Sequence, residues 1–366
     1  MITRVLGRLG LIGFTLAITV LLVEVASRFV FPQWAPVGGD RAYWNYDETL
    51  GWSHRPNQSG RFEFEDFSAD VAINSAGLRD EELPLERVPG KKRMLLLGDS
   101  ATWGFGVEQH ETYGEILERR HPDWEVINAG VSGYGTDQEY LYYKTRGAAY
   151  QPDIVLVLFS GNDPENNFHS VQYWHNKPLF RVEGEGIQLT NVPVPTASFT
   201  QMLANYVAKN TYFLRTAAHM LAQMSRGSPK AEVFAEQRKQ GGSSHEARPT
   251  ETPADPLTVA KDDLSLRILL ALNEAARENG AELVIVGSTL GGPPRNLVFS
   301  DPRFVESRIP YRSLTGSFKG SKEPVRFEHD PHWTPHGHTI VADKVEEFLI
   351  ELGIFSGPGR EGSPGA

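Results

Sequence analysis

A serine and a histidine, two residue types that together perform acyl transfer, each stand in a short motif at a structural boundary. Ser100 ends a Gly-Asp-Ser tripeptide after the apolar run 94–97, and His332 ends an Asp-Pro-His tripeptide before a predicted helix. A serine hydroxyl is a weak nucleophile until an imidazole takes its proton, and a nearby carboxylate orients that imidazole. The residues predict Ser100 as nucleophile, His332 as base and Asp330 as the orienting acid. The alternative for the first tripeptide is a plain helix cap.

Two further motifs carry groups that could bind the negative oxygen of an acyl-transfer intermediate. Gly130 lies in a glycine-rich stretch after the predicted strand 125–128, and Asn162 follows the most apolar predicted strand, 154–159. Backbone N–H groups and amide side chains both donate hydrogen bonds to an oxyanion. We expect the Gly130 N–H group and the Asn162 side chain as donors to such an oxyanion. Taken singly, Gly130 also suits a tight turn and Asn162 an Asx turn.

The histidines after His332 raise the alternative of a metal site. His332 and His336 have the spacing of a His-x-x-x-His motif, which needs both side chains on one helical face. Pro335 is expected at the first helical position, which leaves His332 outside the helix. We therefore expect no metal and no cofactor, and we interpret His336 and His338 as surface or capping residues.

The elements that must position these groups form a repeating pattern of apolar run, loop and amphipathic helix from residue 93 onward. Short buried runs that alternate with helices indicate a parallel sheet covered on both faces. The predicted strands are 94–97, 125–128, 154–159 and 283–287, and the predicted helices are 112–120, 137–149, 258–278 and 335–352. Gly280 should stop the third helix, and Thr334 should be the N-cap of the fourth.

The other segments suggest a division of the chain. We assign 1–32 to a membrane anchor, 33–90 to a small β-rich extension and 91–355 to the catalytic domain. Within that domain, 164–257 is an insertion with a predicted hairpin at 179–189 and an amphipathic helix at 199–224. Residues 225–256 are rich in Ser, Gly, Pro and charged residues, and with the tail 356–366 they are expected to be disordered.

Composition excludes several classes of function. The chain has 366 residues, a net charge of -10 and no cysteine. Nucleic-acid binding draws its affinity from clustered lysines and arginines, so we expect no nucleic-acid partner. Without cysteine there are no disulfides, thiolate nucleophiles or cysteine zinc sites. With 40% apolar residues, the chain can bury a core of α/β size.

The N-terminus predicts a single membrane span. Residues 9–23 carry no charge, and apolar residues resume after Glu24, so the segment approaches the roughly 20 residues that span a bilayer. Arg4 and Arg8 precede it, which by the positive-inside rule keeps the N-terminus in the cytoplasm. We expect a single-pass protein of the cytoplasmic membrane with a periplasmic or extracellular catalytic domain. A cleaved signal peptide and a buried core helix are the alternatives.

The four motifs together resemble the SGNH/GDSL hydrolase family, whose name refers to a Ser, Gly, Asn and His in four blocks in this order. The resemblance covers residues 93–163 and 325–352. It implies a flavodoxin-like three-layer α/β/α fold and gives Ser100, Gly130, Asn162, His332 and Asp330 the roles stated above. It also implies an oxyanion hole made of the Ser100 and Gly130 N–H groups and the Asn162 side chain. With the anchor and the stretch 74–79, the chain is similar to the membrane-anchored bacterial branch of the family.

The chain departs from the family pattern at two positions. Many members carry an aspartate three residues before the catalytic histidine, whereas this chain has His329 there and Asp330 two residues before. This Asp-x-His spacing is similar to that of the alginate O-acetylation proteins. Ser160 stands where the third block usually begins with glycine, a change that affects only the backbone of that loop.

The leading hypothesis is a serine esterase that hydrolyses acyl or acetyl esters on a cell-envelope glycan or lipid through an acyl-enzyme on Ser100. The Asp-x-His spacing suggests an alternative, transfer of the acyl group to a polysaccharide hydroxyl. A third hypothesis is a catalytically inactive envelope-binding protein on the same scaffold. Acetate release, formation of acetylated sugar and labelling by a fluorophosphonate probe distinguish the three.

Overall fold

The computed structural model describes residues 2–30, 43–64, 66–173, 175–202, 211, 255–292 and 296–356. The chain divides into two compact units, one made of Met1–Gly38 with Ala197–Gln240 and the other of Gly39–Thr196 with Gly241–Ala366. The disorder expected at 225–256 and 356–366 lies almost wholly outside the described residues, as does most of the helix predicted at 199–224. These expectations stay predictions.

The first unit contains the long helix α1 (Ile2–Val30). Its segment Gly10–Phe29 has a mean hydropathy of 2.0 and is 6% buried, so it is long and apolar enough to cross a membrane. A signal sequence has similar length and composition. Glu24 and Arg28 form an ion pair one turn apart, with 3.2 Å between the carboxylate and guanidinium atoms.

The second unit is built on a five-stranded sheet in which all neighbouring strands are parallel. Its spatial order, β13-β12-β7-β5-β6, is the 2-1-3-4-5 order of flavodoxin-like folds. In such sheets ligands bind beyond the carboxyl ends of the strands where the order reverses, which here lies between β5 and β7. The strands are β5 (Lys92–Leu97), β6 (Trp124–Asn128), β7 (Ile154–Phe159), β12 (Glu282–Gly287) and β13 (Tyr311–Ser313).

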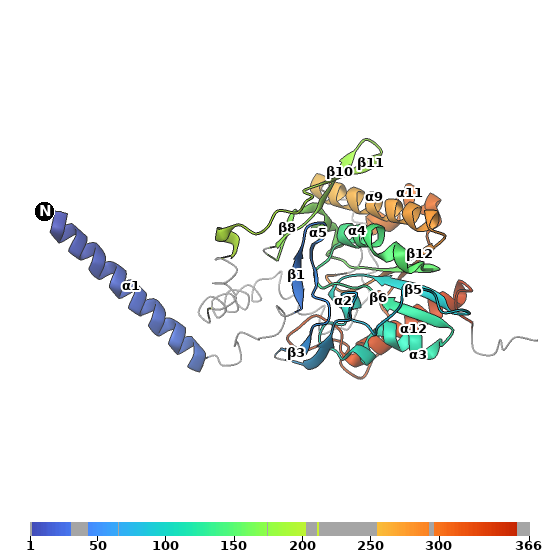
Figure 1. Ribbon diagram of the computed structural model, residues 1–366, viewed down its shortest axis with the longest axis horizontal. Coiled ribbons are helices and arrows are strands. Elements are labelled where there is room, and N and C mark those ends of the chain that lie inside the picture. The colour runs from blue at the N-terminus through green and yellow to red at the C-terminus, as the bar shows by residue number, and fades with distance from the viewer. Residues whose placement is uncertain are drawn as a thin grey trace, which may run out of the picture. The chain divides into compact units, whose positions relative to one another are not determined.

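Helices cover both faces of this sheet, because its strands bury side chains on both sides. On one face α4 (Thr136–Thr145) packs against α9 (Pro256–Glu278), and on the other α3 (Tyr113–Arg120) packs against α12 (Pro335–Glu351), as Figure 1 shows. Successive side chains of a strand point to opposite faces. Leu95 therefore joins the core under α4 and α9, and Leu96 joins the core under α3 and α12. The expected three-layer α/β/α fold is confirmed.

The main element boundaries predicted from sequence lie within a few residues of those in the structure. The predicted helix 137–149 is α4 followed by the 3-10 helix Gly147–Tyr150. Thr334 is the N-cap of α12, where its side chain accepts the Gly337 N–H, and Gly280 follows α9 with a φ of +77°. The short edge strand β13 was not predicted, because three residues are too few for a recognisable period.

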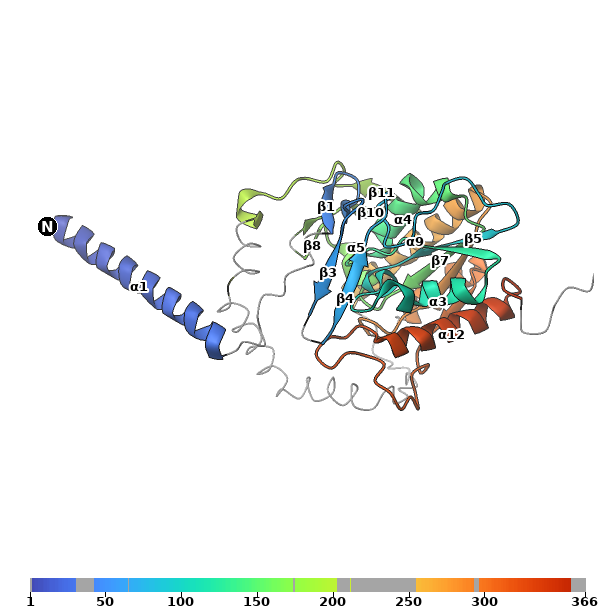
Figure 2. The ribbon, with the colours of Figure 1, turned by 60° about the horizontal axis from the view of Figure 1, so that its bottom comes forward.

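Residues before β5 form two antiparallel hairpins, β1 (Trp44–Asp47) with β2 (Gly51–His54) and β3 (Ser59–Glu63) with β4 (Ser68–Ala72). Figure 2 shows β3 and β4 side by side next to the main sheet. The alternating residues of the second hairpin bury Phe62, Ala69 and Val71. Phe62 and Val71 share a core cluster with Trp103, which follows β5 in the chain, so this extension and the sheet domain share packed side chains.

The insertion after β7 begins with α5 (Asp163–Phe168) and continues as short hairpins that include the one predicted at 179–189. Lys177 between these hairpins is fully buried and its ammonium group pairs with the Asp137 carboxylate at 2.7 Å. The remaining elements are β8 (Val171–Gln172), β9 (His175–Asn176), β10 (Leu179–Glu183), β11 (Gly186–Thr190), α10 (Asn296–Phe299), α11 (Pro302–Ser307) and the 3-10 helix Gln109–Glu111.

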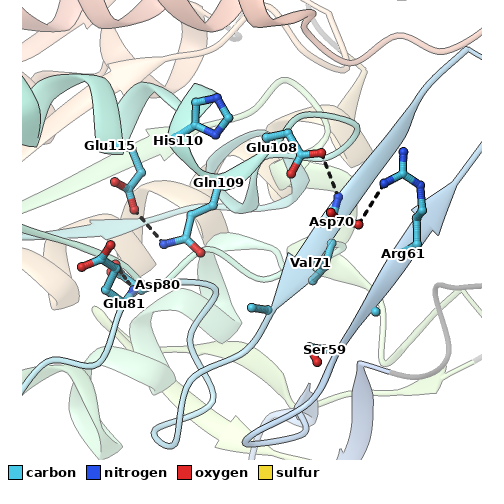
Figure 3. Close-up of a pocket in the computed structure, with 12 residues that line it drawn as sticks. Ser59, Arg61, Asp70, Val71, Asp80, Glu81, Glu108, Gln109, His110 and Glu115 are labelled. Carbon is cyan, nitrogen blue, oxygen red and sulfur yellow. Dashed lines mark hydrogen bonds and ion pairs between the residues drawn. The ribbon is translucent and has the colours of Figure 1, made fainter.

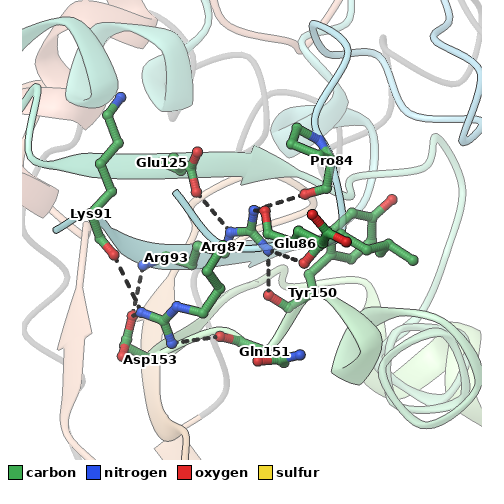
Figure 4. Close-up of polar contacts among 10 residues, drawn as sticks. Pro84, Glu86, Arg87, Lys91, Arg93, Glu125, Tyr150, Gln151 and Asp153 are labelled. Carbon is green, nitrogen blue, oxygen red and sulfur yellow. Dashed lines mark hydrogen bonds and ion pairs between the residues drawn. The ribbon is translucent and has the colours of Figure 1, made fainter. Parts of the chain in front are cut away.

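The buried Arg93 binds the segment that joins the extension to β5. Arg93, the second residue of β5, is 0% exposed and its Nε donates to Glu125 Oε2 at 2.7 Å. The other guanidinium nitrogens donate to backbone carbonyl oxygens, as Figure 4 shows. These carbonyls belong to Pro84, Leu85, Glu86 and Tyr150, at 2.7 to 2.9 Å. Arg93 thus ties residues 84–86 to the amino end of the sheet.

Candidate active site

Ser100 lies at the carboxyl end of β5, where the chain turns into the short helix α2 (Ser100–Trp103). The N-cap of α2 is Asp99, whose side chain accepts the Ala101 N–H at 2.9 Å. The capping alternative for this tripeptide is therefore correct for its aspartate. The same cap holds Ser100 at the start of the helix, with 9% of its surface exposed.

Ser100, His332 and Asp330 form a continuous chain of hydrogen bonds. The Ser100 Oγ and His332 Nε2 are 2.6 Å apart, and the His332 Nδ1 and Asp330 Oδ1 are 2.5 Å apart. Asp330 Oδ1 also accepts the backbone N–H of His332 at 2.9 Å. One carboxylate oxygen therefore orients both the imidazole ring and the backbone of His332. The side chains of His332 and Asp330 are 15% and 11% exposed. This is the geometry of a nucleophile, a base and an orienting acid.

Asn162 follows β7 and faces the same edge of the sheet. It stands at the N-cap of α5 without a capping hydrogen bond from its side chain. Asp163 closes this loop instead, because its Oδ2 accepts the Ser160 N–H at 2.8 Å and its own N–H donates to the Ser160 carbonyl at 3.1 Å. The Asn162 side chain lies close enough to Asp99 to lower the pKa of that carboxyl. Asp99, which caps the helix that begins at Ser100, therefore lies beside the predicted oxyanion donor.

Asp99 and Asp163 both have raised pKa values. Burial raises the pKa of Asp99, and this rise is opposed by the Ala101 N–H, by His332 and by the Ser160 and Asn162 side chains. Burial, and next the charge of Asp99, raise the pKa of Asp163 well above its ordinary value. Like charges in a dry site repel each other, so the charge on one carboxyl disfavours ionisation of the other.

Gly130 lies two residues beyond β6 and directly beside α2. A Cβ atom at this position would stand 2.5 Å from the Trp103 backbone nitrogen, so the close approach requires glycine. The Gly130 N–H donates to Asn128 Oδ1 at 3.0 Å, and Asn128 Nδ2 donates to the Thr102 carbonyl at 2.9 Å. An oxyanion at this point would therefore share or replace the bond from Gly130 to Asn128.

One aromatic side chain of the site could not be predicted from the sequence. The Phe105 ring stacks on the His332 imidazole, with 4.2 Å between ring centroids and 23° between planes. This contact covers one face of the base, so the ring can move in fewer directions. Phe105 follows the Gly-Asp-Ser motif closely, but an aromatic residue there is equally compatible with any core position.

The other two histidines of the fourth motif lie apart from the triad. His336 Nε2 is 2.9 Å from Ser321 Oγ, and His336 is half-buried. The interpretation of His338 as a surface residue is wrong, because it is 1% exposed. The capping alternative holds for the neighbouring helix α3, which begins at Tyr113. Its Nδ1 accepts the Tyr113 N–H at 3.3 Å, and burial lowers its pKa to about 3. The helical period turns this residue inward onto α3.

A pocket of about 690 Å³ lies away from the triad, between the β3–β4 hairpin and the segment 108–115, as Figure 3 shows. Its carboxylates are those of Asp70, Asp80, Glu81, Glu108 and Glu115. Several of them already have partners within the chain: Glu108 accepts the Asp70 N–H, and Asp80 accepts the Asn128 N–H. The pocket shows where the extension meets the residues that follow the nucleophile.

Comparison with known proteins gives one family match. The model of the GDSL-like lipase/acylhydrolase family matches residues 96–338. No curated protein matches.

Solved structures with low identity also align with the chain. Esterase EstA from Pseudoalteromonas sp. is 13% identical, with a TM-score of 0.39 and coverage of 72% of this chain and 98% of that one. A lipase/acylhydrolase from Enterococcus faecalis is 11% identical, with a TM-score of 0.37 and coverage of 71% and 96%. A two-domain esterase active on acetylated mannans is 12% identical, with a TM-score of 0.33 and coverage of 75% and 52%.

The family match includes the strand ends that carry Ser100, Gly130 and Asn162, and also His332, and it spans well over half of the 366 residues. The chain belongs to the GDSL-like lipase/acylhydrolase family and is a serine hydrolase that acts on ester bonds.

Proposed function

We propose that this enzyme hydrolyses acyl or acetyl esters through an acyl-enzyme on Ser100, with His332 as base and Asp330 as orienting acid. The observation that carries the proposal is the unbroken chain from the Ser100 Oγ through His332 to Asp330, with contacts of 2.6 and 2.5 Å. With the Nδ1 proton on the Asp330 side, the lone pair of Nε2 faces the serine hydroxyl. This is the tautomer that general-base catalysis needs.

In the first half-reaction the Ser100 Oγ attacks the ester carbonyl carbon while its proton moves to His332 Nε2. The carbonyl oxygen becomes an oxyanion, which the N–H groups of Ser100 and Gly130 and the Asn162 amide stabilise. Asp330 stabilises the imidazolium that forms. The C–O bond to the alcohol then breaks, and His332 gives its proton to the leaving oxygen, which leaves an acyl ester on Ser100.

In the second half-reaction water replaces the serine. His332 takes a proton from the water, whose oxygen attacks the acyl carbon and passes through the same oxyanion geometry. The bond to the Ser100 Oγ breaks and the serine recovers a proton from His332. The products are a carboxylic acid and the free enzyme.

The N-terminal helix supports the proposed substrate class. We propose that α1 stays in the cytoplasmic membrane, with the N-terminus in the cytoplasm and the catalytic unit in the periplasm or outside the cell. The uncharged span and the arginines before it support this orientation. An esterase held there meets the acyl and acetyl esters of cell-envelope glycans and lipids.

The test compares the full-length wild type with Ser100→Ala in detergent. The wild type should be labelled at Ser100 by a fluorophosphonate and should hydrolyse p-nitrophenyl acetate. Ser100→Ala should lose about 10⁶-fold in kcat with little change in melting temperature, because only the nucleophile is removed. Near-normal hydrolysis by purified Ser100→Ala would refute the mechanism.

Acyl transfer is the second candidate, favoured by the Asp-x-His spacing of Asp330 and His332. In that reaction a sugar hydroxyl replaces water in the second half-reaction. Acetate and acetylated oligosaccharide should be measured in one assay with an acetyl donor and a saccharide acceptor. Acetylated sugar in excess of free acetate would identify a transferase.

A further inference from the structure

Arg79 of the extension reaches into the turn that follows the nucleophile helix. The residue is 1% exposed. Its Nη1 donates to the carbonyl oxygens of Trp103 and Gly104, at 3.1 and 2.5 Å, and its Nη2 donates to that of Val107 at 2.6 Å. The guanidinium carbon also lies 4.8 Å from the centroid of the Trp103 ring. One side chain thus binds three carbonyls of the segment 103–107, here called the nucleophile turn.

The nucleophile turn contacts both Ser100 and His332. The backbone N–H groups of Gly104 and Phe105 donate to the Ser100 carbonyl at 3.1 and 3.0 Å. Gly104 has a φ of +85°, a conformation that glycine adopts without strain. Phe105, the next residue, stacks on the His332 ring at 4.2 Å. The position of this turn therefore determines where the nucleophile backbone lies and which ring packs on the base.

The buried Arg79 guanidinium is well suited to bind the carbonyl oxygens of the nucleophile turn. Burial lowers the pKa of Arg79 to about 10, so it stays charged at neutral pH, and the charge of Glu108 acts in the opposite direction to burial. The planar guanidinium presents several donors at fixed angles, which suits three carbonyls around one bend. A lysine presents its three N–H donors from one tetrahedral nitrogen, which does not match the planar spread of donors that reaches these carbonyls.

Asp80, the residue after Arg79, connects the extension to the residues around the predicted oxyanion donor Gly130. Asp80 Oδ2 accepts the Asn128 N–H at 2.7 Å, and Asn128 is the residue whose side chain binds the Gly130 N–H and the Thr102 carbonyl. Figure 3 shows Glu108 from the segment after the turn accepting the Asp70 N–H of β4 at 3.0 Å. The extension therefore contacts the second motif as well as the nucleophile turn.

We infer that Arg79 is a positioning residue for the ester reaction: by binding the carbonyls of the nucleophile turn, it holds Ser100 and the Phe105 ring on His332 in the geometry that makes the serine reactive. The inference rests on the proposed function, since it assigns Arg79 an effect on that chemistry. It gives the β-rich extension a part in catalysis beyond covering the core.

Arg93 provides a matched control. It is as buried as Arg79, and most of its hydrogen bonds also go to backbone carbonyls, but these belong to residues 84–86 and 150 at the amino end of β5. Arg79→Lys and Arg93→Lys each keep the charge and remove several buried hydrogen bonds. Only Arg79→Lys changes the turn that contacts the triad.

The experiment uses full-length protein in detergent, at a temperature well below the melting temperature of the less stable variant. For each variant we would measure the melting temperature, the rate constant of fluorophosphonate labelling, and kcat and KM for p-nitrophenyl acetate. Both variants should have a lower melting temperature than the wild type. Arg79→Lys should lower the labelling rate constant and kcat by roughly 10- to 100-fold, because small misplacements of reacting groups have effects of that size. Its KM should stay within about twofold, and Arg93→Lys should keep near-wild-type rates.

Phe105→Leu tests the same link without touching Arg79. It removes the ring on His332 and leaves the carbonyls of the turn in place, so labelling should slow by about threefold to tenfold. Equal labelling rates for Arg79→Lys and Arg93→Lys would overturn the inference, and if Arg79→Lys does not fold, wild-type labelling of Phe105→Leu would overturn it. A wild-type protein that fluorophosphonate does not label contradicts the proposed function first.

Discussion

The two ends of strand β5 use similar chemistry for different purposes. At the amino end, Arg93 binds backbone carbonyls of the segment that leads into the strand. At the carboxyl end, Arg79 binds backbone carbonyls of the nucleophile turn. Both arginines are essentially unexposed, and both connect the extension to the sheet domain. The difference lies in the segments to which the bound carbonyls belong. Those bound by Arg93 belong to a connecting segment, and those bound by Arg79 belong to the turn that positions the reactive serine.

This difference follows from the direction of the strands. In a parallel sheet all carboxyl ends meet at one edge, so loops that leave different strands can place side chains around a common point. The amino ends meet at the opposite edge, where the loops only return the chain. Changes at the carboxyl end should therefore alter the rate of reaction more than stability, and changes at the amino end should do the reverse.

The largest expected effect on stability is at the amino end. Arg93→Met removes the cation and leaves the Glu125 carboxylate, 2.7 Å from Arg93 Nε and 5% exposed, buried without its partner. Breaking such a buried pair costs about 3–5 kcal/mol. Denaturant unfolding followed by tryptophan fluorescence should show this loss, while kcat per folded molecule stays close to wild type. A large loss of kcat with unchanged stability would break the comparison.

The next largest effect is at the carboxyl ends of the strands, and it is a change in the rate of the reaction. Asn162→Ala should lower kcat by roughly 100-fold, since one oxyanion donor is worth on the order of 3 kcal/mol of transition-state stabilisation. The free energy of unfolding should change little, because the amide does not cap α5. Asn166→Ala, on the same helix, is the matched amide control and should keep its activity. Equal activity of the two variants would remove Asn162 from the oxyanion hole.

The smallest expected effect is a pH dependence of stability that comes from Glu118, which lies near Lys91 and Glu125. Burial raises the pKa of Glu118 to about 7, and the charge of Glu115 acts in the same direction. The folded chain then keeps a proton that the unfolded chain releases near pH 4.5, so this stabilisation is complete below about pH 4.5 and is lost as the pH rises through about 7.

Glu118→Gln cannot ionise and should be more stable than wild type at pH 8 and equal to it near pH 4.5. We expect a gain of roughly 1 kcal/mol at pH 8, which is well below the full value of the pKa shift because the side chain is partly exposed. Denaturation midpoints at both pH values measure it. Glu278→Gln, at an exposed glutamate of α9, controls for the loss of one negative charge. A gain of the same size at both pH values would contradict the assignment.

Much of the candidate site was predictable because of where its residues stand. Ser100, Gly130 and Asn162 each follow a strand whose apolar run is visible in the sequence, and the ends of parallel strands meet at one edge. His332 and Asp330 were predictable from their chemistry and from the helix start at Pro335. The structure brings Ser100, His332 and Asp330 into one hydrogen-bonded chain. It also places Asn162 near Asp99, and Gly130 beside α2.

Other contacts were not predictable. Arg79 binds carbonyl oxygens, which every residue possesses, so no pattern of side chains could have identified its partners. The ring of Phe105 meets His332 only because two segments distant in the chain cross at the sheet edge. His338 resembled a polar helix residue, and its burial depends on the helix that lies opposite.

The sequence by itself determined the order of strands and helices, the three-layer architecture and the residue types that meet at the carboxyl edge. These follow from hydrophobic periodicity and from turn and cap residues, which act over a few neighbouring positions. Only the tertiary structure decided which backbone carbonyls a buried guanidinium binds, which ring covers the base and which acids are buried close together. Those choices depend on distances between segments far apart in the chain, and burial sets their energies only after the whole core has packed.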